Sequence, residues 1–310
     1  MGKVKQPTSG PGFVKPCKKY DVHTHLGFEG NEMGLFTVES RMEFDKMMGI
    51  EKCVILPAAA LPPATMPGLE PSGPKMFTSE DACEIARKHP EHFIWFCNVY
   101  PTGTDETYEE LKRYKEMGAA GVGEFATVLR FDDPKMEHLF KCCEELELPF
   151  LFHMSPNGIN YGVIDEPGLP LLEQALVKFP KVKFIGHSQP FWFEISEYPS
   201  DLTPEERNVY PGGKVIPGRV PYLLEKYPNL YADLSADSGG NALLRDADYG
   251  IEFLIKFQDK LLFGSDICNT DFIYPLASYL DSLLHQFKIS EEVYEKICKT
   301  NMEKVFGLTN

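Results

Sequence analysis

The chain has 310 residues and a formal net charge of −15 at pH 7. Such a negative field repels nucleic acid and anionic membrane surfaces, so we expect neither as a partner. No run of about 18 apolar residues occurs, so no membrane span is expected. The first residues lack the apolar segment of a signal peptide. The 8 cysteines are scattered without a CxxC pair, which favours reduced thiols in the cytoplasm.

Short apolar, β-branched or aromatic runs recur along the sequence. Runs this apolar are typical of strands that are buried on both faces of a parallel sheet. We therefore expect eight strands, within residues 19–27, 52–58, 92–100, 118–126, 148–155, 181–189, 229–236 and 260–268.

Helical patterns separate most of these strands, within residues 79–90, 104–118, 132–149, 169–180, 218–228 and 248–260. Ser79 or Asp81 is the expected cap of the first, Thr104 of the second, and Asp133 of the third, with Pro134 in its first turn. This alternation predicts an α/β protein, a (β/α)8 TIM barrel closed by extra C-terminal helices. A doubly wound open sheet is the alternative, but no G-x-G-x-x-G follows the first strand.

The expected organisation is a loose N-terminal arm over residues 1–18 and one barrel domain over residues 19–310. Two connections are long, residues 57–78 and residues 189–217. Both follow strands and would lie on the C-terminal face of the barrel. Loops of this length in a compact domain are usually functional, so we expect lids over a site.

Four histidines fall at the C-terminal ends of expected strands, where barrel enzymes place their sites. His23 and His25, in DVHTH, share a face because side chains alternate along a strand, and two imidazoles on one face suit a metal ion. His153 and His187 end the fifth and sixth strands. Alone, either is more often a satisfied core residue, but together with the pair they favour a metal site. The remaining histidines are expected to be structural: His89, His92, His138 and His285.

Two acids fall at the same height, Glu124 at the end of the fourth strand and Asp266 at the end of the eighth. A carboxylate at the end of so apolar a strand needs an ion or a paired partner. The plainer roles are a salt bridge for Glu124 and a helix cap for Asp266. Asp21 is expected one layer below His23, as support or packing, and Asp233 as structural or substrate-facing.

The order of these residues resembles the amidohydrolase superfamily, and more narrowly its amidohydrolase-related (amidohydrolase 2) group of metal-dependent TIM-barrel hydrolases and decarboxylases. DVHTH, GHSQPFW and LLFGSD carry the resemblance, which spans residues 19 to 308. It implies that His23, His25 and Asp266 hold a divalent metal, usually zinc and sometimes manganese or iron. His153 and His187 would hold a second ion, or His153 would join the first and leave His187 for catalysis.

Many members with two metals bridge them with a carboxylated lysine on the fourth strand. This chain has Glu124 there, whose two oxygens can bridge two ions, so the number of ions stays open at one or two. The resemblance implies a hydrolase of an amide, ester or lactone bond, with Asp266 as general base and acid. His187, if it is not a ligand, would polarise the carbonyl.

Two other functions are open. A nonoxidative decarboxylase of a small aromatic or unsaturated carboxylic acid would use one metal and an acid, Asp266 or His187. A binding protein without activity is the weakest, because the ligand set is complete. For a small-molecule substrate, the expected contacts are Arg130 with a carboxylate, Trp192 with a flat group and Glu194 with a polar group. Arg130 could equally be a solvated loop arginine, and Trp192 could anchor its loop or lie in a homo-oligomer interface.

Overall fold

The computed structural model describes residues 16–29, 34–57, 77–156, 161–271 and 274–308. Most of the expected N-terminal arm and most of the long connection at residues 57–78 lie outside these residues, so nothing tests the expectations for them. Among the described residues, no helix is long and apolar enough to cross a membrane.

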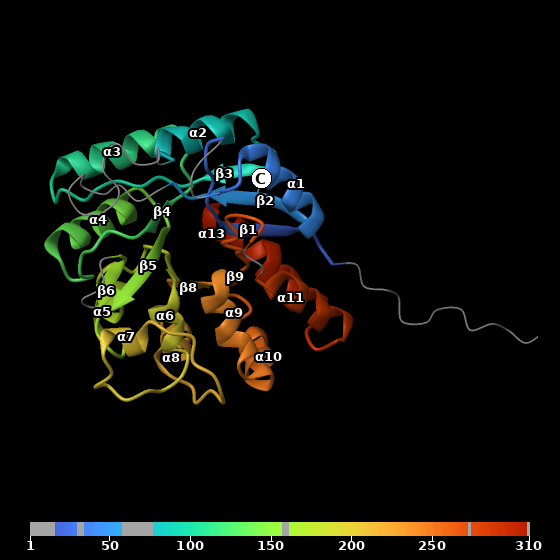
Figure 1. The fold of residues 1–310 in the computed structure, drawn as a ribbon. Coiled ribbons are helices and arrows are strands. Elements are labelled where there is room, and N and C mark those ends of the chain that lie inside the picture. The colour runs from blue at the N-terminus through green and yellow to red at the C-terminus, as the bar shows by residue number, and fades with distance from the viewer. Residues whose placement is uncertain (1–15, 30–33, 58–76, 157–160, 272–273, 309–310) are drawn as a thin grey trace, which may run out of the picture.

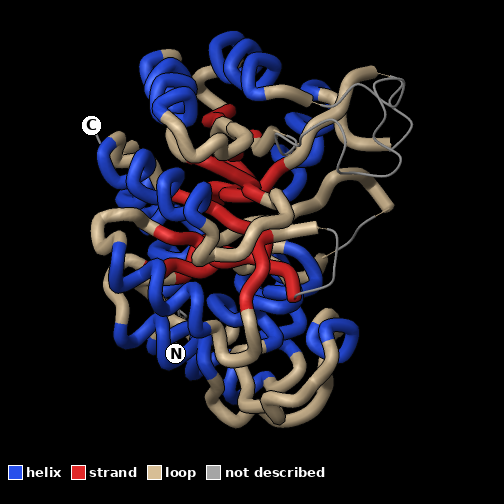
Figure 2. The backbone as a smooth tube through the Cα atoms, turned by 90° about the vertical axis from the view of Figure 1, so that its left-hand side faces the viewer, coloured by secondary structure: helices blue, strands red, loops and turns tan. Residues whose placement is uncertain are grey.

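Eight parallel strands form the wall of a barrel, and helices cover its outside (Figures 1 and 2). The strands pair in two arcs, β1–β2–β3 and β4–β5–β7–β8–β9, with the short β6 (Val163–Asp165) paired beside β5. Each of the eight wall strands overlaps one of the expected runs, although β2 begins two residues before its run and β5 ends one residue after its run, whereas β6 was not expected. Their bounds are β1 Lys19–Thr24, β2 Ile50–Ile55, β3 Phe93–Trp95, β4 Val122–Phe125, β5 Phe150–Pro156, β7 Phe184–His187, β8 Leu230–Asp233 and β9 Leu261–Leu262.

Backbone hydrogen bonds join the two arcs at both seams. Between β3 and β4, Gly123 N–H donates to Cys97 O at 3.0 Å. Between β9 and β1, Val22 N–H donates to Phe263 O and Asp266 N–H donates to His23 O, both at 3.0 Å. The sheet therefore closes on itself, and the expectation of a (β/α)8 barrel is confirmed.

Several helices begin at a residue whose side chain caps the first turn, whereas Thr104, the expected cap of α3, precedes that helix without a side-chain capping hydrogen bond. Asp133 caps α4 by accepting from Lys135 N–H at 2.8 Å, and Pro134 occupies the first turn, as expected. The cap of α2 is Thr78, not Ser79 or Asp81. Thr78 and Asp81 form a reciprocal capping box, which satisfies two backbone donors at once. The helices that cover the barrel are α1 Val38–Met48, α2 Ser79–Lys88, α3 Asp105–Glu116, α4 Pro134–Glu145, α5 Pro170–Lys178, α8 Arg219–Lys226, α9 Ala236–Leu244, α10 Ala247–Lys256 and α11 Leu276–His285.

The C-terminal segment closes one end of the barrel, as expected. It comprises α12 (Glu291–Glu295), a π-helical turn η1 (Lys296–Thr300) and α13 (Asn301–Phe306). From α13, Met302 and Val305 join the cluster of side chains that fills the barrel, beside Tyr20 from the start of β1. The ring of Phe306 lies 5.0 Å from that of Phe96. Because this apolar plug occupies the N-terminal ends of the strands, the opposite ends are left for a site.

The connection at residues 189–217 is not simply a long loop. It contains α6 (Gln189–Phe193) and α7 (Pro204–Arg207), and the side chains of Phe191 and Trp192 are buried in the core. Its apolar residues therefore anchor this segment to the barrel.

Candidate metal centre and active site

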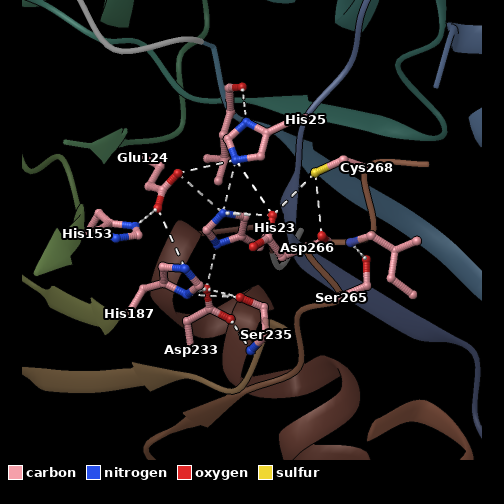
Figure 3. A network of polar contacts seen from close by, with 12 residues as sticks. His23, His25, Glu124, His153, His187, Asp233, Ser235, Ser265, Asp266 and Cys268 are labelled. Carbon is pink, nitrogen blue, oxygen red and sulfur yellow. Dashed lines mark hydrogen bonds and ion pairs between the residues drawn. The ribbon is translucent and has the colours of Figure 1, made fainter. Parts of the chain in front are cut away.

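The structure brings the six expected ligands together at the C-terminal ends of the strands (Figure 3). Nε2 of His23 and Nε2 of His25 lie 3.2 Å apart, so the pair converges although the β1–β2 register shifts between Asp21 and Thr24. Glu124 comes from β4, His153 from β5 and His187 from the last position of β7. Asp266 follows β9.

Glu124 occupies the middle of the group, between two pairs of imidazoles (Figure 3). Its Oε2 lies 3.2 Å from Nε2 of His25 and 3.6 Å from Nε2 of His23. Its Oε1 lies 2.6 Å from Nδ1 of His153 and 3.6 Å from Nε2 of His187. Each oxygen of this one carboxylate therefore faces a different histidine pair.

Asp266 completes the side of the centre that faces His23 and His25. Its Oδ1 lies 3.6 Å from Nε2 of His23 and 3.8 Å from Nε2 of His25. The residue has a φ of 52°, a conformation that a residue with a side chain adopts at a cost of about 1–3 kcal/mol. The hydrogen bond from its N–H to His23 O holds it there.

These donor atoms fit a divalent cation. Nitrogen and oxygen ligands lie about 2.0–2.2 Å from zinc, so ligand atoms that share one ion lie within about 4.4 Å of one another. Most of the separations around Glu124 and Asp266 are 3.2–3.8 Å. In three overlapping sets, the ligand atoms all lie within 4.8 Å of one another: His23, His25 and Glu124; His23, His187 and Asp266; and Glu124, His153 and His187.

Asp233 and Ser235 orient two of the imidazoles. Oδ2 of Asp233 lies 2.7 Å from Nδ1 of His23 and 3.1 Å from Nδ1 of His187, and it also accepts from the hydroxyl of Ser235 at 2.7 Å. Because a carboxylate only accepts, His23 carries hydrogen on Nδ1. The hydroxyl of Ser235 donates to Asp233 and so accepts from Nδ1 of His187 at 3.0 Å, and both rings present Nε2 to the centre. Nδ1 of His25 donates in the same way to Leu56 O at 3.1 Å.

The position of Asp233 was open in the sequence pattern, which allowed a structural or a substrate-facing role. Its position at the end of the seventh strand, at the same height as the histidines, was the feature of the sequence that could have indicated a contact with them. Gly264 permits its approach, since a Cβ there would lie 2.5 Å from Oδ1 of Asp233.

Burial and mutual charge shift the pKa values in this centre. Burial opposes the charged form of His23, but the three surrounding carboxylates outweigh it and raise its pKa well above the ordinary value. Burial opposes ionisation of Glu124, yet His153 and His23 hold its pKa well below the ordinary value. Asp233 behaves like Glu124, because His23 and His187 lower its pKa against the effect of burial. The carboxylates of Glu124 and Asp233 are therefore ionised and collect negative charge beside the imidazoles, which favours a bound cation.

Asp21 does not lie inside the barrel below His23. Its carboxylate accepts from the N–H groups of His23 and Ser265, and its Oδ2 lies 2.6 Å from the guanidinium of Arg41 on α1. The expectation that Asp21 lies inside the barrel, one layer below His23, was wrong because the register shift interrupts the alternation of side chains along β1. Val22 fills the barrel instead. Asp21 supports the backbone of β1 from outside the wall.

The three expected substrate contacts lie apart from the six ligands. Arg130 pairs with Asp132 at 2.9 Å and with Glu166 at 2.7 Å. The indole N–H of Trp192 donates to Asp233 O at 2.8 Å, and its ring is buried, which anchors α6 to β8. Glu194 accepts from Gly168 N–H at 2.9 Å. A role for any of them in substrate binding stays a prediction.

Two further side chains border the centre, and the sequence pattern did not select them. The ring of Tyr161 lies 4.7 Å from that of His153. Tyr161 is 37% exposed, but desolvation of its phenol and the charges of Glu124 and Asp266 raise the pKa well above the ordinary value, so it is a neutral hydrogen-bond donor. The thiol of Cys268 lies 3.5 Å from Oδ1 of Asp266. The position of Cys268, two residues after Asp266, could have indicated in the sequence that it borders the centre. Nothing in the sequence indicated this for Tyr161.

Comparison with known proteins agrees with the fold. The amidohydrolase family model Amidohydro_2 matches residues 20–308. No curated protein sequence matches the chain.

Three solved structures are similar over nearly their whole length. A 2,6-dihydroxybenzoate decarboxylase from Rhizobium has 16% identity and a TM-score of 0.57, over 94% of this chain and 99% of that one. A dihydroxybenzoic acid decarboxylase from a Polaromonas species, with bound manganese and 2-nitroresorcinol, has 18% identity and a TM-score of 0.57, over 95% and 98%. A probable 2-pyrone-4,6-dicarboxylic acid hydrolase from Acinetobacter baumannii, with citric acid bound, has 15% identity and a TM-score of 0.54, over 94% and 99%.

At these identities the structural likeness establishes the fold alone. The match of the family model extends from the second residue of β1 to the end of the described C-terminal segment. It includes every one of the six ligands that converge at the strand ends. The chain belongs to the amidohydrolase family.

Proposed function

We propose that the protein is a metal-dependent hydrolase of an amide, ester or lactone bond in a small molecule. The observation that carries this proposal is the position of Glu124, whose two oxygens face two different histidine pairs. A carboxylate in this position suits a centre for two divalent cations. With a bridging carboxylate and imidazoles as ligands, zinc is the first metal to test, and manganese or iron suits the same donors.

A divalent cation held here supplies a Lewis acid and lowers the pKa of a coordinated water to about 7. Asp266 would serve as the general base and acid, taking a proton from water and passing it to the leaving group, because its side chain is 21% exposed at the open end of the barrel. His187 is nearly fully buried and is fixed by Asp233 and Ser235. Its Nε2 therefore has one orientation, which suits a ligand or a group that polarises a carbonyl.

A nonoxidative decarboxylase is the second candidate. It is favoured by the similar solved structures, two of which carry the names of dihydroxybenzoate decarboxylases, one with manganese bound. In that case His23, His25, His153 and Asp266 would hold one ion, and Glu124 would orient ligands. The proton for the carbon that loses carbon dioxide would come from Asp266 or His187.

Metal content separates the two functions. We would measure ions per chain in freshly purified protein and in Glu124→Gln, and then assay both with neutral esters, amides and lactones and with aromatic carboxylic acids. Two ions that fall to one or none in the variant, with turnover of a neutral substrate, would support hydrolysis. One ion in both proteins, with release of carbon dioxide from a carboxylic acid, would support decarboxylation. A folded protein without metal affinity would contradict both.

A further inference from the structure

A second group of metal-ligand side chains lies outside the barrel wall, under α1. It consists of Asp45 on α1, Cys53 on β2 and His92 just before β3, and we call it the side cluster. Oδ2 of Asp45 lies 2.8 Å from Sγ of Cys53 and 2.8 Å from Nε2 of His92. Sγ of Cys53 lies 3.6 Å from Nε2 of His92.

The donors of the side cluster suit a cation that prefers sulfur. Zinc binds thiolate at about 2.3 Å and imidazole or carboxylate at about 2.0–2.2 Å, so its tetrahedral ligands lie about 3.5 Å apart. The observed separations need to change by less than an ångström. A thiolate with an imidazole selects zinc over magnesium, calcium or manganese.

The surroundings hold these donors in place. The backbone N–H of Cys53 donates to His92 O at 2.9 Å, which ties two of the ligands together. Oδ1 of Asp45, the oxygen that faces away from Cys53, lies 2.8 Å from Nε of Arg41. A ligand carboxylate whose second oxygen has its own partner is the usual outer arrangement of a metal site.

The solvent access and the charge of the side cluster also suit a bound cation. The side chains of Asp45 and Cys53 are buried, whereas that of His92 is 12% exposed and opens the cluster to solvent. Arg41 is balanced by the carboxylates of Asp21 and Asp45 together, so the cluster has no spare positive charge. Without an ion, the thiol of Cys53 donates its hydrogen to Oδ2 of Asp45 at 2.8 Å. An ion would take the place of that proton.

We propose that Asp45, Cys53 and His92 bind one divalent cation of the zinc type, separate from the ions of the catalytic centre. It joins α1 to β2 and to the start of β3. Through Arg41 and Asp21 it also steadies β1, the strand that carries His23. The role is structural and does not depend on which reaction the catalytic centre performs.

Cobalt(II) tests this directly, because a cobalt ion bound by thiolate shows a charge-transfer band in the near ultraviolet that imidazole and carboxylate ligands do not give. The full chain is stripped of metal, titrated with Co²⁺ and compared with Cys53→Ser. The matched control is Cys268→Ser, since Cys268 borders the catalytic centre. The proposal expects the band in the unchanged chain and in Cys268→Ser, and its loss in Cys53→Ser. No band in the unchanged chain, or its loss in Cys268→Ser alone, would overturn the proposal.

Metal content gives a second readout that needs no turnover. In a chain with His23→Ala and His25→Ala, zinc content should fall by one ion on adding Cys53→Ser and stay unchanged on adding Cys268→Ser. If Cys53→Ser does not fold, His92→Gln replaces it, with an expected loss of affinity of about tenfold or more for the cobalt ion that gives the band. Unchanged affinity in His92→Gln would overturn the proposal. Failure here leaves the hydrolase proposal standing, because that proposal rests on Glu124.

Discussion

The catalytic centre and the side cluster are built from similar side chains in opposite surroundings. In the catalytic centre, His25, His153 and Asp266 are 24%, 20% and 21% exposed, and the described contacts include no arginine or lysine. In the side cluster, a helix covers the ligands, and the fully buried Arg41 lies against Asp45. In the first arrangement, a charged His23 and a bound cation are the groups that can balance the carboxylates. In the second, Arg41 already supplies one positive charge against Asp21 and Asp45.

The comparison indicates that substitutions in the catalytic centre mainly affect activity, whereas substitutions beside the side cluster mainly affect stability. The partly exposed His25 and Asp266 can change with little loss of packing, whereas Arg41 is fully buried between two carboxylates. The two regions meet at Asp21, which accepts from Arg41 on one side and from the backbone of His23 on the other. The substitutions below test whether activity and stability really divide along this line.

The largest expected effect is on activity, in the catalytic centre. His23→Ala and Asp266→Asn should each lower kcat/KM by about 10³-fold or more, because each removes a ligand or proton acceptor at the reacting atoms. In the metal-free chain, Asp266→Asn should change the free energy of unfolding little, whereas His23→Ala should lower it by about 1–3 kcal/mol, because the buried Asp233 loses a partner. Activity is measured on the substrate found in the screen, and unfolding by urea titration. Full activity in both variants would put the reaction elsewhere in the molecule.

The next effect is on stability, beside the side cluster. Arg41→Met should lower the free energy of unfolding by about 3–5 kcal/mol, since it leaves the buried carboxylates of Asp21 and Asp45 without a counter-charge. Adding Asp45→Asn should recover part of the loss, because one of the unpaired charges is then removed. Urea denaturation followed by circular dichroism measures both. A loss below about 1 kcal/mol would mean that Arg41 is not what balances this region.

Asp233 should affect metal affinity more than stability. Asp233→Asn keeps the shape of the side chain but no longer forces hydrogen onto Nδ1 of both His23 and His187. Loss of such an outer partner lowers metal affinity by about 10–100-fold. Competition with a chelating dye measures the affinity. Asp237→Asn, an exposed carboxylate on α9, is the matched control and should leave it unchanged.

Much of this division could be predicted from the sequence, because it depends on where strands end. The eight apolar runs and their following residues placed His23, Glu124 and Asp266 on one face without any long-range information. The role of Asp233 could not be predicted, because it depends on Gly264 allowing another strand to approach. Asp21 was placed wrongly because a register shift is invisible in a pattern of alternation.

The side cluster was missed for a different reason. Its three ligands are far apart in the sequence and sit in no recognisable spacing, and His92 was expected to be merely structural. Only the packing of α1 against β2 brings Asp45 to Cys53. Chain order predicts sites built from the ends of parallel strands, but it does not predict contacts between a helix and the strand that it covers.

Acidification should weaken metal binding in the catalytic centre earlier than in a site of ordinary histidines. In the metal-free chain the pKa of His23 is raised well above 6.5, so a proton competes with the ion below that raised value. Affinity should be constant above it and fall by about tenfold per pH unit below it for each proton that the ion displaces. Titrations with zinc between neutral and mildly alkaline pH measure this slope. A flat affinity across that range would mean that the carboxylates do not hold a proton on His23.

The smallest expected effect is at His89, three residues before His92 at the same end of the barrel. His89 is 36% exposed, and its nearest acid, Glu91, lies 4.0 Å away, whereas the ring of His92 lies 2.8 Å from Asp45. His89→Ala should change the free energy of unfolding by less than about 0.5 kcal/mol and leave turnover unchanged. His92→Ala should cost about 1–3 kcal/mol, because Asp45 loses a buried partner. Equal losses of stability in the two variants would mean that the side cluster adds nothing to stability. A large loss of turnover in His89→Ala would mean that the active site has been assigned to the wrong end of the barrel.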